Sequence, residues 1–162
     1  MSEETDAQNV SESLHKVRQV EFEAALEAAL NCASPNDVMK LIPYSGFIGA
    51  QASVVDGRAR YWLDARVSNI GNPSLPAIHG GVIGGFLELS VLVELLFCLE
   101  TSAFPKVIDF SLDYLRPARY QTLYAHCQIL RQGKQVVNAA ATAWQDDIKT
   151  PVATARGHFL IH

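Results

Sequence analysis

The stretch HGGVIGGFLELSVLVELLFCLE, residues 79–100, decides the fold. Nearly every position after its first glycines is apolar, which predicts a long helix over about this range that is hydrophobic almost all round. Such a helix lies either in the centre of a soluble domain or across a membrane. Glu88, Ser90 and Glu94 make insertion unfavourable, since a central acid costs roughly 2.5–3.5 kcal/mol there. We therefore expect the centre of a soluble fold and no membrane partner.

The chain before this helix begins with helical patterns. Residues 1–13 are polar and acidic with no apolar period, which indicates a disordered tail. Apolar residues recur at helical spacing over 14–30 and predict an amphipathic helix. Ser34 is then placed to cap a short helix that begins at Pro35 and ends before Pro43.

The period changes to that of strands beyond these helices. GFIGAQASVV (46–55) and RARYWLDA (58–65) are predicted to pair as antiparallel strands. Asp56-Gly57 joins them, and this dipeptide tolerates the positive φ angles of a tight hairpin. Residues 67–78 are rich in Gly, Pro, Asn and Ser, so we expect a loop.

Four further strands are predicted after the long helix, separated by turn residues. They cover residues 107–115, 121–130, 135–144 and 152–161. One helix between two blocks of strands predicts an α+β fold, in which a curved antiparallel sheet of about six strands wraps around one central helix. We expect a single domain over 14–162, with N-terminal helices at 14–42 and the core at 43–162.

Composition narrows the class of protein. The 162 residues are 49% hydrophobic and 19% charged, which suits one domain with a sizeable core. The net charge of -4 argues against a nucleic-acid partner, because phosphate binding needs clustered cations. Cys32, Cys98 and Cys127 are odd in number and widely spaced, which favours reduced thiols and no metal site. The acidic start does not resemble a secretion signal, so we expect a cytoplasmic protein.

The start of the long helix carries the candidate chemistry. Gly81, Gly84 or Gly85, and Glu88 fall on one helical stripe. The first N–H groups of a helix have no internal partner, and Gly80 and Gly81 leave them uncovered. Such donors suit a carbonyl oxygen that gains negative charge during attack. Glu88 would supply that attack as a general base toward water or as a nucleophile.

Neighbouring residues have supporting or structural interpretations. Asn72, in the loop, would orient the water or the substrate carbonyl. His79 is expected to hold the loop through hydrogen bonds rather than act as the base. The missing side chains of Gly84 and Gly85 would let a strand or a partner helix approach closely. Glu94 lies on another helix face, where we expect it to be solvated or at an interface.

Three runs, GNPSLPAIHGGVIGGFLE, IDFSLDYLRPA and HCQILRQGKQVVNAAATAW, resemble the hot-dog-fold acyl-CoA thioesterases of the PaaI-like group over residues 44–161. The resemblance implies hydrolysis of an acyl-CoA-type thioester, with coenzyme A as part of the substrate and no other cofactor. It implies that the Gly80 amide receives the thioester carbonyl while Glu88 of the partner subunit is the base or nucleophile. Asn72, or else Asn69, would be the family's loop asparagine. A site at a subunit interface implies a homodimer, and two dimers can pair into a tetramer.

Cationic and aromatic residues are candidates for the rest of such a substrate. Phosphates of coenzyme A would suit the following side chains: Arg116, Arg119, Lys106, Arg131 and Lys134. An acyl channel would suit Tyr44, Phe47 and Trp62. The chain departs from the family pattern in having Glu88 where Asp is common, and Val107 where some members have Ser or Thr.

Two other functions stay open at this point. A hydratase or dehydratase of the same fold would use His79 and Glu88 for proton transfer. The loop, however, lacks the His-x-x-Pro arrangement that is typical of such enzymes. A non-catalytic acyl-CoA-binding or regulatory protein would use the same pocket without releasing a thiol.

Overall fold

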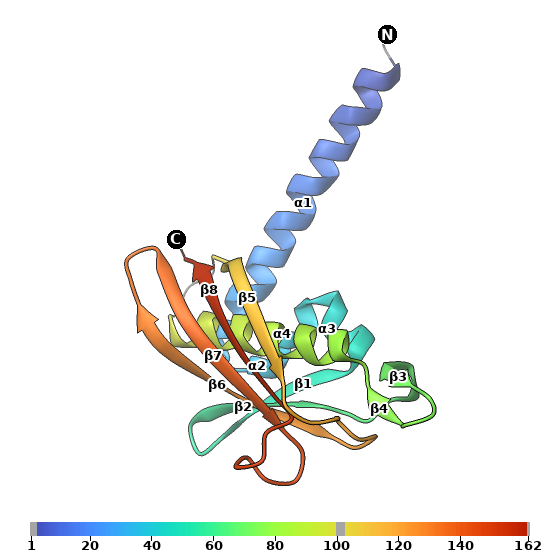
Figure 1. Ribbon diagram of the computed structural model, residues 1–162. Helices are drawn as coiled ribbons and strands as arrows, with labels where there is room; N and C mark the ends of the chain where they lie inside the picture. The colour runs from blue at the N-terminus through green and yellow to red at the C-terminus, as the bar shows by residue number, and fades with distance from the viewer. Residues whose placement is uncertain (1–2, 100–102, 162) are drawn as a thin grey trace.

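The computed structural model describes residues 3–99 and 103–161 (Figure 1). Its helices are α1 (Glu3–Asn31), α2 (Pro35–Leu41), α3 (Pro43–Ile48) and α4 (Gly80–Cys98), with a short 3-10 helix at Val67–Asn69. Its strands are β1 (Ala50–Val55), β2 (Arg58–Leu63), β3 (Ile70–Asn72), β4 (Ala77–Ile78), β5 (Lys106–Tyr114), β6 (Leu123–Gln132), β7 (Val136–Trp144) and β8 (Ala153–Leu160).

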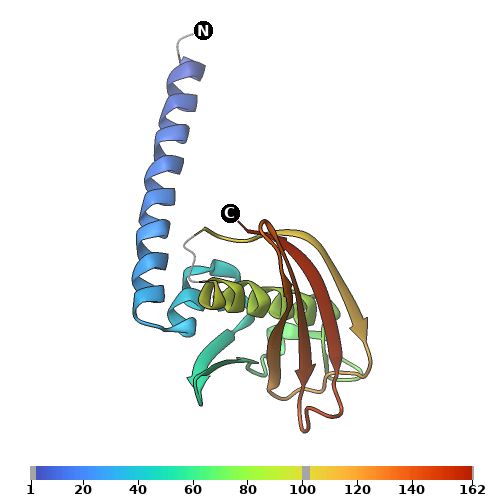
Figure 2. The same ribbon diagram turned by 90° about the vertical axis from the view of Figure 1, so that its left-hand side faces the viewer.

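Six of these strands form one antiparallel sheet in the order β1-β2-β6-β7-β8-β5. The sheet curves around α4, and α1 projects away from this body (Figures 1 and 2). The prediction of a six-stranded sheet around one central helix is confirmed. So is the hairpin, in which Asp56 and Gly57 have φ angles of 53° and 74°.

The core combines large side chains from α4 with small ones from the sheet. Phe86, Leu87 and Leu95 of the helix have no exposed surface. The facing strand positions are mostly alanine, as follows: Ala125, Ala139, Ala141, Ala143, Ala153 and Ala155. Small residues on the sheet leave room for the helix, so both layers pack closely at ordinary interior density.

The close approach expected at Gly84 is present, and its partner is a strand. A Cβ at this position would lie 2.8 Å from Leu112 Cδ1 of β5, so the end of that leucine side chain would have to move. The absence of a side chain at Gly84 therefore lets the edge strand β5 pack against α4.

The membrane interpretation is also resolved in favour of the core. Within the described residues, α4 is long and apolar enough to cross a bilayer by length and composition, but 61% of that helical window is buried in the fold. The apolar surface of this helix is therefore used for packing.

The N-terminal region differs from the prediction in two places. Helix α1 begins at Glu3, within the stretch expected to be a tail, because residues 3–13 contain good helix formers and neither Gly nor Pro. The predicted strand at 46–55 begins only at Ala50. Pro43 starts helix α3 as well as ending α2, since proline suits the first helical position, and Gly49 ends α3 with φ 83°.

The segment expected to be a loop, residues 67–78, contains a 3-10 turn and the two-stranded pairing of β3 with β4. This small sheet leads directly into α4 through His79, whose backbone N–H donates to Asn69 O at 2.8 Å. The predicted C-terminal end of the long helix, Glu100, lies outside the described residues.

Candidate active site

The start of α4 holds one unused hydrogen-bond donor. Val82 N and Ile83 N both donate to His79 O, at 2.9 and 3.2 Å. Gly81 N donates to the His79 ring atom Nδ1 at 3.0 Å. Among the described residues, no acceptor faces the Gly80 N–H. The site prediction thus becomes more specific: the Gly80 amide is available to a ligand oxygen, and the Gly81 amide is already bonded.

His79 has the structural role that we expected. It is the N-cap of α4, with extended backbone angles, and its exposed ring accepts the Gly81 hydrogen bond through Nδ1. An unprotonated Nδ1 places the ring proton of the neutral form on Nε2. His79 therefore holds the helix start in shape while the Gly80 N–H stays open.

Glu88 is half-buried on the same helical stripe as Gly81 and Gly85. Within the part of the chain that the structure describes, its carboxylate has no hydrogen-bond or ion-pair partner. A half-buried carboxylate normally needs a compensating partner, so its isolation in one subunit indicates that the partner is water, a ligand or a second copy.

The loop asparagines have structural roles. Asn72 is exposed, and its Oδ1 accepts from Ser74 N and Leu75 N at 3.0 and 3.3 Å, a turn formed by its own loop. Asn69 is buried and donates to Ile48 O at 2.7 Å. The side-chain oxygen of Asn72 therefore accepts hydrogen bonds within its own turn, and Asn69 connects the loop to α3 by a hydrogen bond.

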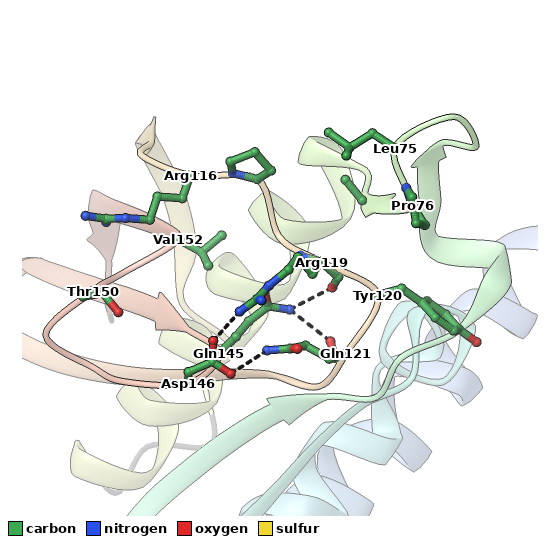
Figure 3. A pocket seen from close by; sticks show the side chains of 12 residues that line it. Leu75, Pro76, Arg116, Arg119, Tyr120, Gln121, Gln145, Asp146, Thr150 and Val152 are labelled. Carbon is green, nitrogen blue, oxygen red and sulfur yellow. Dashed lines mark hydrogen bonds and ion pairs between the residues drawn. The ribbon is translucent and has the colours of Figure 1, made fainter.

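A groove runs from the helix start along the ends of β5 and β7. Its inner part, a hollow of about 370 Å³, is lined by Gly80, Ile83 and Tyr114. Its outer part measures about 820 Å³ and contains Arg116 and Arg119 (Figure 3). Both parts are lined by Ala77, Arg116 and Pro117, so they adjoin each other. We call the whole the helix-start groove.

The two arginines of this groove differ in availability. Arg119 forms an ion pair with Asp146, and Gln145 brackets its backbone (Figure 3). Arg116 donates one N–H to Pro151 O at 2.7 Å and has no acidic partner among the described residues. Arg116 therefore keeps its net positive charge for a ligand.

The other predicted cations lie elsewhere. Lys106 starts β5, which ends at Tyr114, and eight residues of extended strand span about 26 Å. Arg131 and Lys134 line a separate hollow at the β6–β7 turn, together with His158. Lys106 and Arg116 therefore lie near opposite ends of β5, and Lys106 does not line the helix-start groove of its own subunit.

Tyr114 and Tyr44 make contacts with the first turns of α4 that the sequence did not predict. Tyr114 Oη donates to Gly80 O at 2.8 Å and fixes the end of β5 to the first turn of α4. Tyr44 of α3 lies over Gly85, where a Cβ would be 2.6 Å from its ring. Tyr114 stands in the DYLRPA run, but no local pattern reports a contact made 34 residues away.

Trp62, by contrast, does not face this region. It alternates along β2 with Tyr61 and Leu63, both of which are fully buried against the helix side of the sheet. Successive strand residues point to opposite faces, so Trp62 lies on the outer face of the sheet. It cannot line a channel beside α4.

Glu94, which we expected to be solvated or at an interface, is also a hydrogen-bond acceptor within the subunit. It lies half-buried and accepts from Tyr61 Oη at 2.7 Å and from Cys98 Sγ at 3.6 Å. Burial raises the pKa of the Cys98 thiol from its usual 9.0 to about 11, and the neighbouring Glu94 charge adds to that rise. Burial likewise raises the pKa values of Tyr61 and Cys127 well above their usual range.

The described residues contain no group of three or more His, Cys, Asp or Glu side chains placed to hold a metal ion.

Known proteins place this architecture in a class. The curved sheet around α4, with the open amide at the helix start, defines an α+β protein of the hot-dog fold. The thioesterase superfamily matches over residues 75–152. A protein from Chromobacterium violaceum is 38% identical, with a TM-score of 0.70 over 85% of this chain and 96% of its own. The chain belongs to the thioesterase superfamily, as the PaaI-like resemblance implied.

Two other solved structures share the fold. A phenylacetic acid degradation-related protein from Ralstonia eutropha is 25% identical, with a TM-score of 0.65 over 74% of this chain and 89% of its own. A Bacillus halodurans protein solved with CoA is 20% identical, with a TM-score of 0.67 over 75% of this chain and 79% of its own. No curated protein matches the chain.

Proposed function

We propose that this protein hydrolyses acyl-CoA-type thioesters at a site shared between two subunits. The observation that carries the proposal is the open Gly80 N–H at a helix start, in a groove that leads to Arg116, combined with the unpartnered carboxylate of Glu88 on the same helix. Membership of the thioesterase superfamily supports thioester hydrolysis in general. The CoA-bound relative supports a ligand of the coenzyme A type.

The two halves of this site lie well apart within one chain, which supports a shared site. Gly80 and Glu88 are eight residues apart on α4, and a rise of 1.5 Å per residue separates them by about 12 Å along the helix axis. A general base has to lie within about 3 Å of the water that attacks a bound carbonyl. In the proposed homodimer, Glu88 therefore approaches from the partner, and two such dimers can form a tetramer.

Exposed apolar surface on β5 supports this assembly. β5 is an edge strand of the sheet, and Ile108 and Tyr114 on it are each 55% exposed. An edge strand with free backbone groups and apolar side chains is a surface on which a second copy can pair. This would cover the edge and bring a second α4 close to the first.

The proposed reaction uses each group at one atom. The Gly80 N–H donates to the thioester carbonyl oxygen and stabilises the negative charge that forms there. Glu88 of the partner takes a proton from water while the water oxygen adds to the carbonyl carbon. The C–S bond then breaks, the proton passes to the departing sulfur, and the products are a carboxylic acid and a free thiol. In the alternative route, the Glu88 carboxylate adds to the carbonyl carbon, the C–S bond breaks, and the thiolate leaves and takes a proton from water. A second water then hydrolyses the resulting anhydride to the carboxylic acid and free Glu88.

The groove suggests where coenzyme A would lie. Arg116 and Arg119 stand at its outer part, and Arg116, which has no acid beside it, is the stronger candidate for a phosphate. Lys106 can contribute only from another subunit or another site. We propose a cytoplasmic setting, in which the free thiols of Cys32, Cys98 and Cys127 remain reduced.

The decisive experiment measures thiol release from acetyl-, aryl- and long-chain acyl-CoAs by wild type, Gly80→Pro and Gly80→Ala. Proline removes the open N–H yet suits the first helical position, and His79 already has the extended backbone that precedes proline. Alanine adds the same Cβ, 3.2 Å from Tyr114, but keeps the N–H. Loss of about 10²-fold or more in kcat for proline beyond the alanine value supports the oxyanion role. Equal activity of the two variants would contradict it.

Subunit sharing is tested by mixing two inactive proteins. Heterodimers of Glu88→Gln with Gly80→Pro contain one intact site if the amide and the acid come from different subunits. They contain none if both groups act within one chain. Recovered thiol release supports the shared site, whereas inactive heterodimers exclude it. Binding of acyl-CoA with no turnover of any substrate by wild type would favour the non-catalytic function, and loss of enoyl absorbance would favour a hydratase.

A further inference from the structure

Helix α3 presents a pair of aromatic rings beside α4 that the core does not use. Tyr44 and Phe47 stack with ring centroids 6.2 Å apart and an interplanar angle of 26°. Tyr44 is 41% exposed and Phe47 is 75% exposed. Exposed aromatic surface in the folded subunit contributes little hydrophobic stabilisation, so this stacked pair is available to contact another molecule.

The pair is held at a defined place on α4. The Tyr44 ring occupies the space that a side chain at position 85 would fill, with its Cε1 and Oη at 2.6 and 2.8 Å from an ideal Cβ there. Gly85 and Glu88 are three residues apart and share one face of the helix. The ring therefore lies one helical turn from the Glu88 carboxylate, on the side toward Gly81.

The core closes several of the helix positions next to Glu88. The neighbouring helix positions Phe86, Leu87 and Leu89 are at most 6% exposed and are packed in the core. The surface at Gly85, on the same stripe as Glu88, is only partly buried, so an acyl group within reach of Glu88 can extend over it and meet the Tyr44 ring.

We propose that Tyr44, supported by the stacked Phe47, is the specificity-determining wall of the acyl pocket and restricts the substrate to compact acyl groups. This inference rests on the proposed function, because it takes Glu88 as the acid next to the carbonyl. Gly85 is needed for this wall, because any side chain at position 85 would displace the Tyr44 ring. Long straight chains are excluded because the ring lies in their path.

The test compares acetyl-CoA with decanoyl-CoA as substrates of wild type, Tyr44→Ala, Tyr44→Phe and Phe47→Ala. Tyr44→Ala should raise kcat/KM for decanoyl relative to acetyl by at least roughly 10-fold, the selectivity typical of a few methylene contacts. Phe47→Ala should shift the same ratio less, because the Tyr44 ring remains. Tyr44→Phe should keep the wild-type ratio, since it keeps the ring. Ile148→Ala, at a 48% exposed position in the β7–β8 connection, is the matched control.

A binding arm separates this inference from the proposed function. Non-hydrolysable thioether analogues of acetyl- and decanoyl-CoA are titrated against the same variants, with the Kd ratio as the readout. A shift of that ratio only in Tyr44→Ala and Phe47→Ala supports the wall even if wild type releases no thiol. An unchanged ratio in Tyr44→Ala, in either arm, overturns the inference while leaving hydrolysis intact. Failure of every protein to bind either analogue overturns both proposals.

Discussion

Helix α4 holds two carboxylates, one near its middle and one toward its C-terminal end, and the two have opposite surroundings. Glu94, toward the C-terminal end, accepts from Tyr61 and Cys98. Glu88, nearer the start, has no partner among the described residues. Both lie half-buried on the same helix, so burial alone does not distinguish them. The difference teaches that a satisfied acid belongs to the fold, whereas an unsatisfied one is free to act on a ligand.

The largest expected effect separates the two acids by activity. Glu88→Gln should lower kcat for thioester hydrolysis by about 10²–10⁴-fold, the usual contribution of a general base. Glu94→Gln should leave kcat nearly unchanged, because its amide oxygen still accepts from Tyr61. Thiol release under substrate saturation measures both. Equal loss in the two variants would remove the distinction drawn between the acids.

The free energy of unfolding should depend more on Glu94 than on Glu88, the reverse of the order expected for activity. Glu94→Ala leaves the fully buried Tyr61 hydroxyl without its acceptor and should cost about 1–3 kcal/mol of unfolding free energy. Glu88→Ala breaks no described contact and should change stability by about 0.5 kcal/mol or less. Urea denaturation at one fixed protein concentration provides the values. A larger loss for Glu88→Ala would indicate a structural partner in the assembled protein.

The helix start gives a smaller effect that tests how the open amide is held. His79→Ala removes the side-chain cap of Gly81 N and should cost about 1 kcal/mol. His79→Asn supplies another acceptor and should recover most of it. The same urea titrations measure both variants. If asparagine destabilises as much as alanine does, the ring contributes through packing rather than through its hydrogen bond.

The smallest effect is a pH dependence at the Glu94 end. The pKa of Cys98 is raised to about 11 in the fold, against an ordinary 9.0. Between those values the unfolded chain loses the thiol proton while the folded chain keeps it, so stability should fall as pH rises from about 9 to 11. Chemical denaturation across this range should show a weaker fall in Cys98→Ala. Identical slopes in both proteins would argue against a perturbed Cys98.

Periodic patterns allowed the central elements to be predicted. An apolar run of helical length, six alternating strands and the Asp56-Gly57 turn depend on local chemistry that the sequence states directly. Helix α3 was missed because Pro43 can end one helix and begin the next. The start of α1 at Glu3 was missed because a polar composition does not prevent a helix.

The candidate site was predictable only in part, for a similar reason. The glycines at the helix start and Glu88 share one element, so their relation follows from helical geometry. The Glu94–Tyr61 hydrogen bond spans 33 residues and the Tyr114–Gly80 bond spans 34. Contacts of that separation are set by the curvature of the sheet, which no local pattern reports. Which glycine amide stays open depended likewise on the rotamer of His79.

The alanine-lined inner face of the sheet has a consequence for how the protein works in solution. Because Ala139, Ala141 and Ala143 pack against α4 with at most 2% exposure, a ligand cannot enter between the helix and the sheet at these positions. The proposed reaction chamber is then a property of the assembly. The fraction of subunits that form this chamber should depend on protein concentration through mass action. Specific activity per subunit should therefore decline on dilution below the dimer dissociation constant.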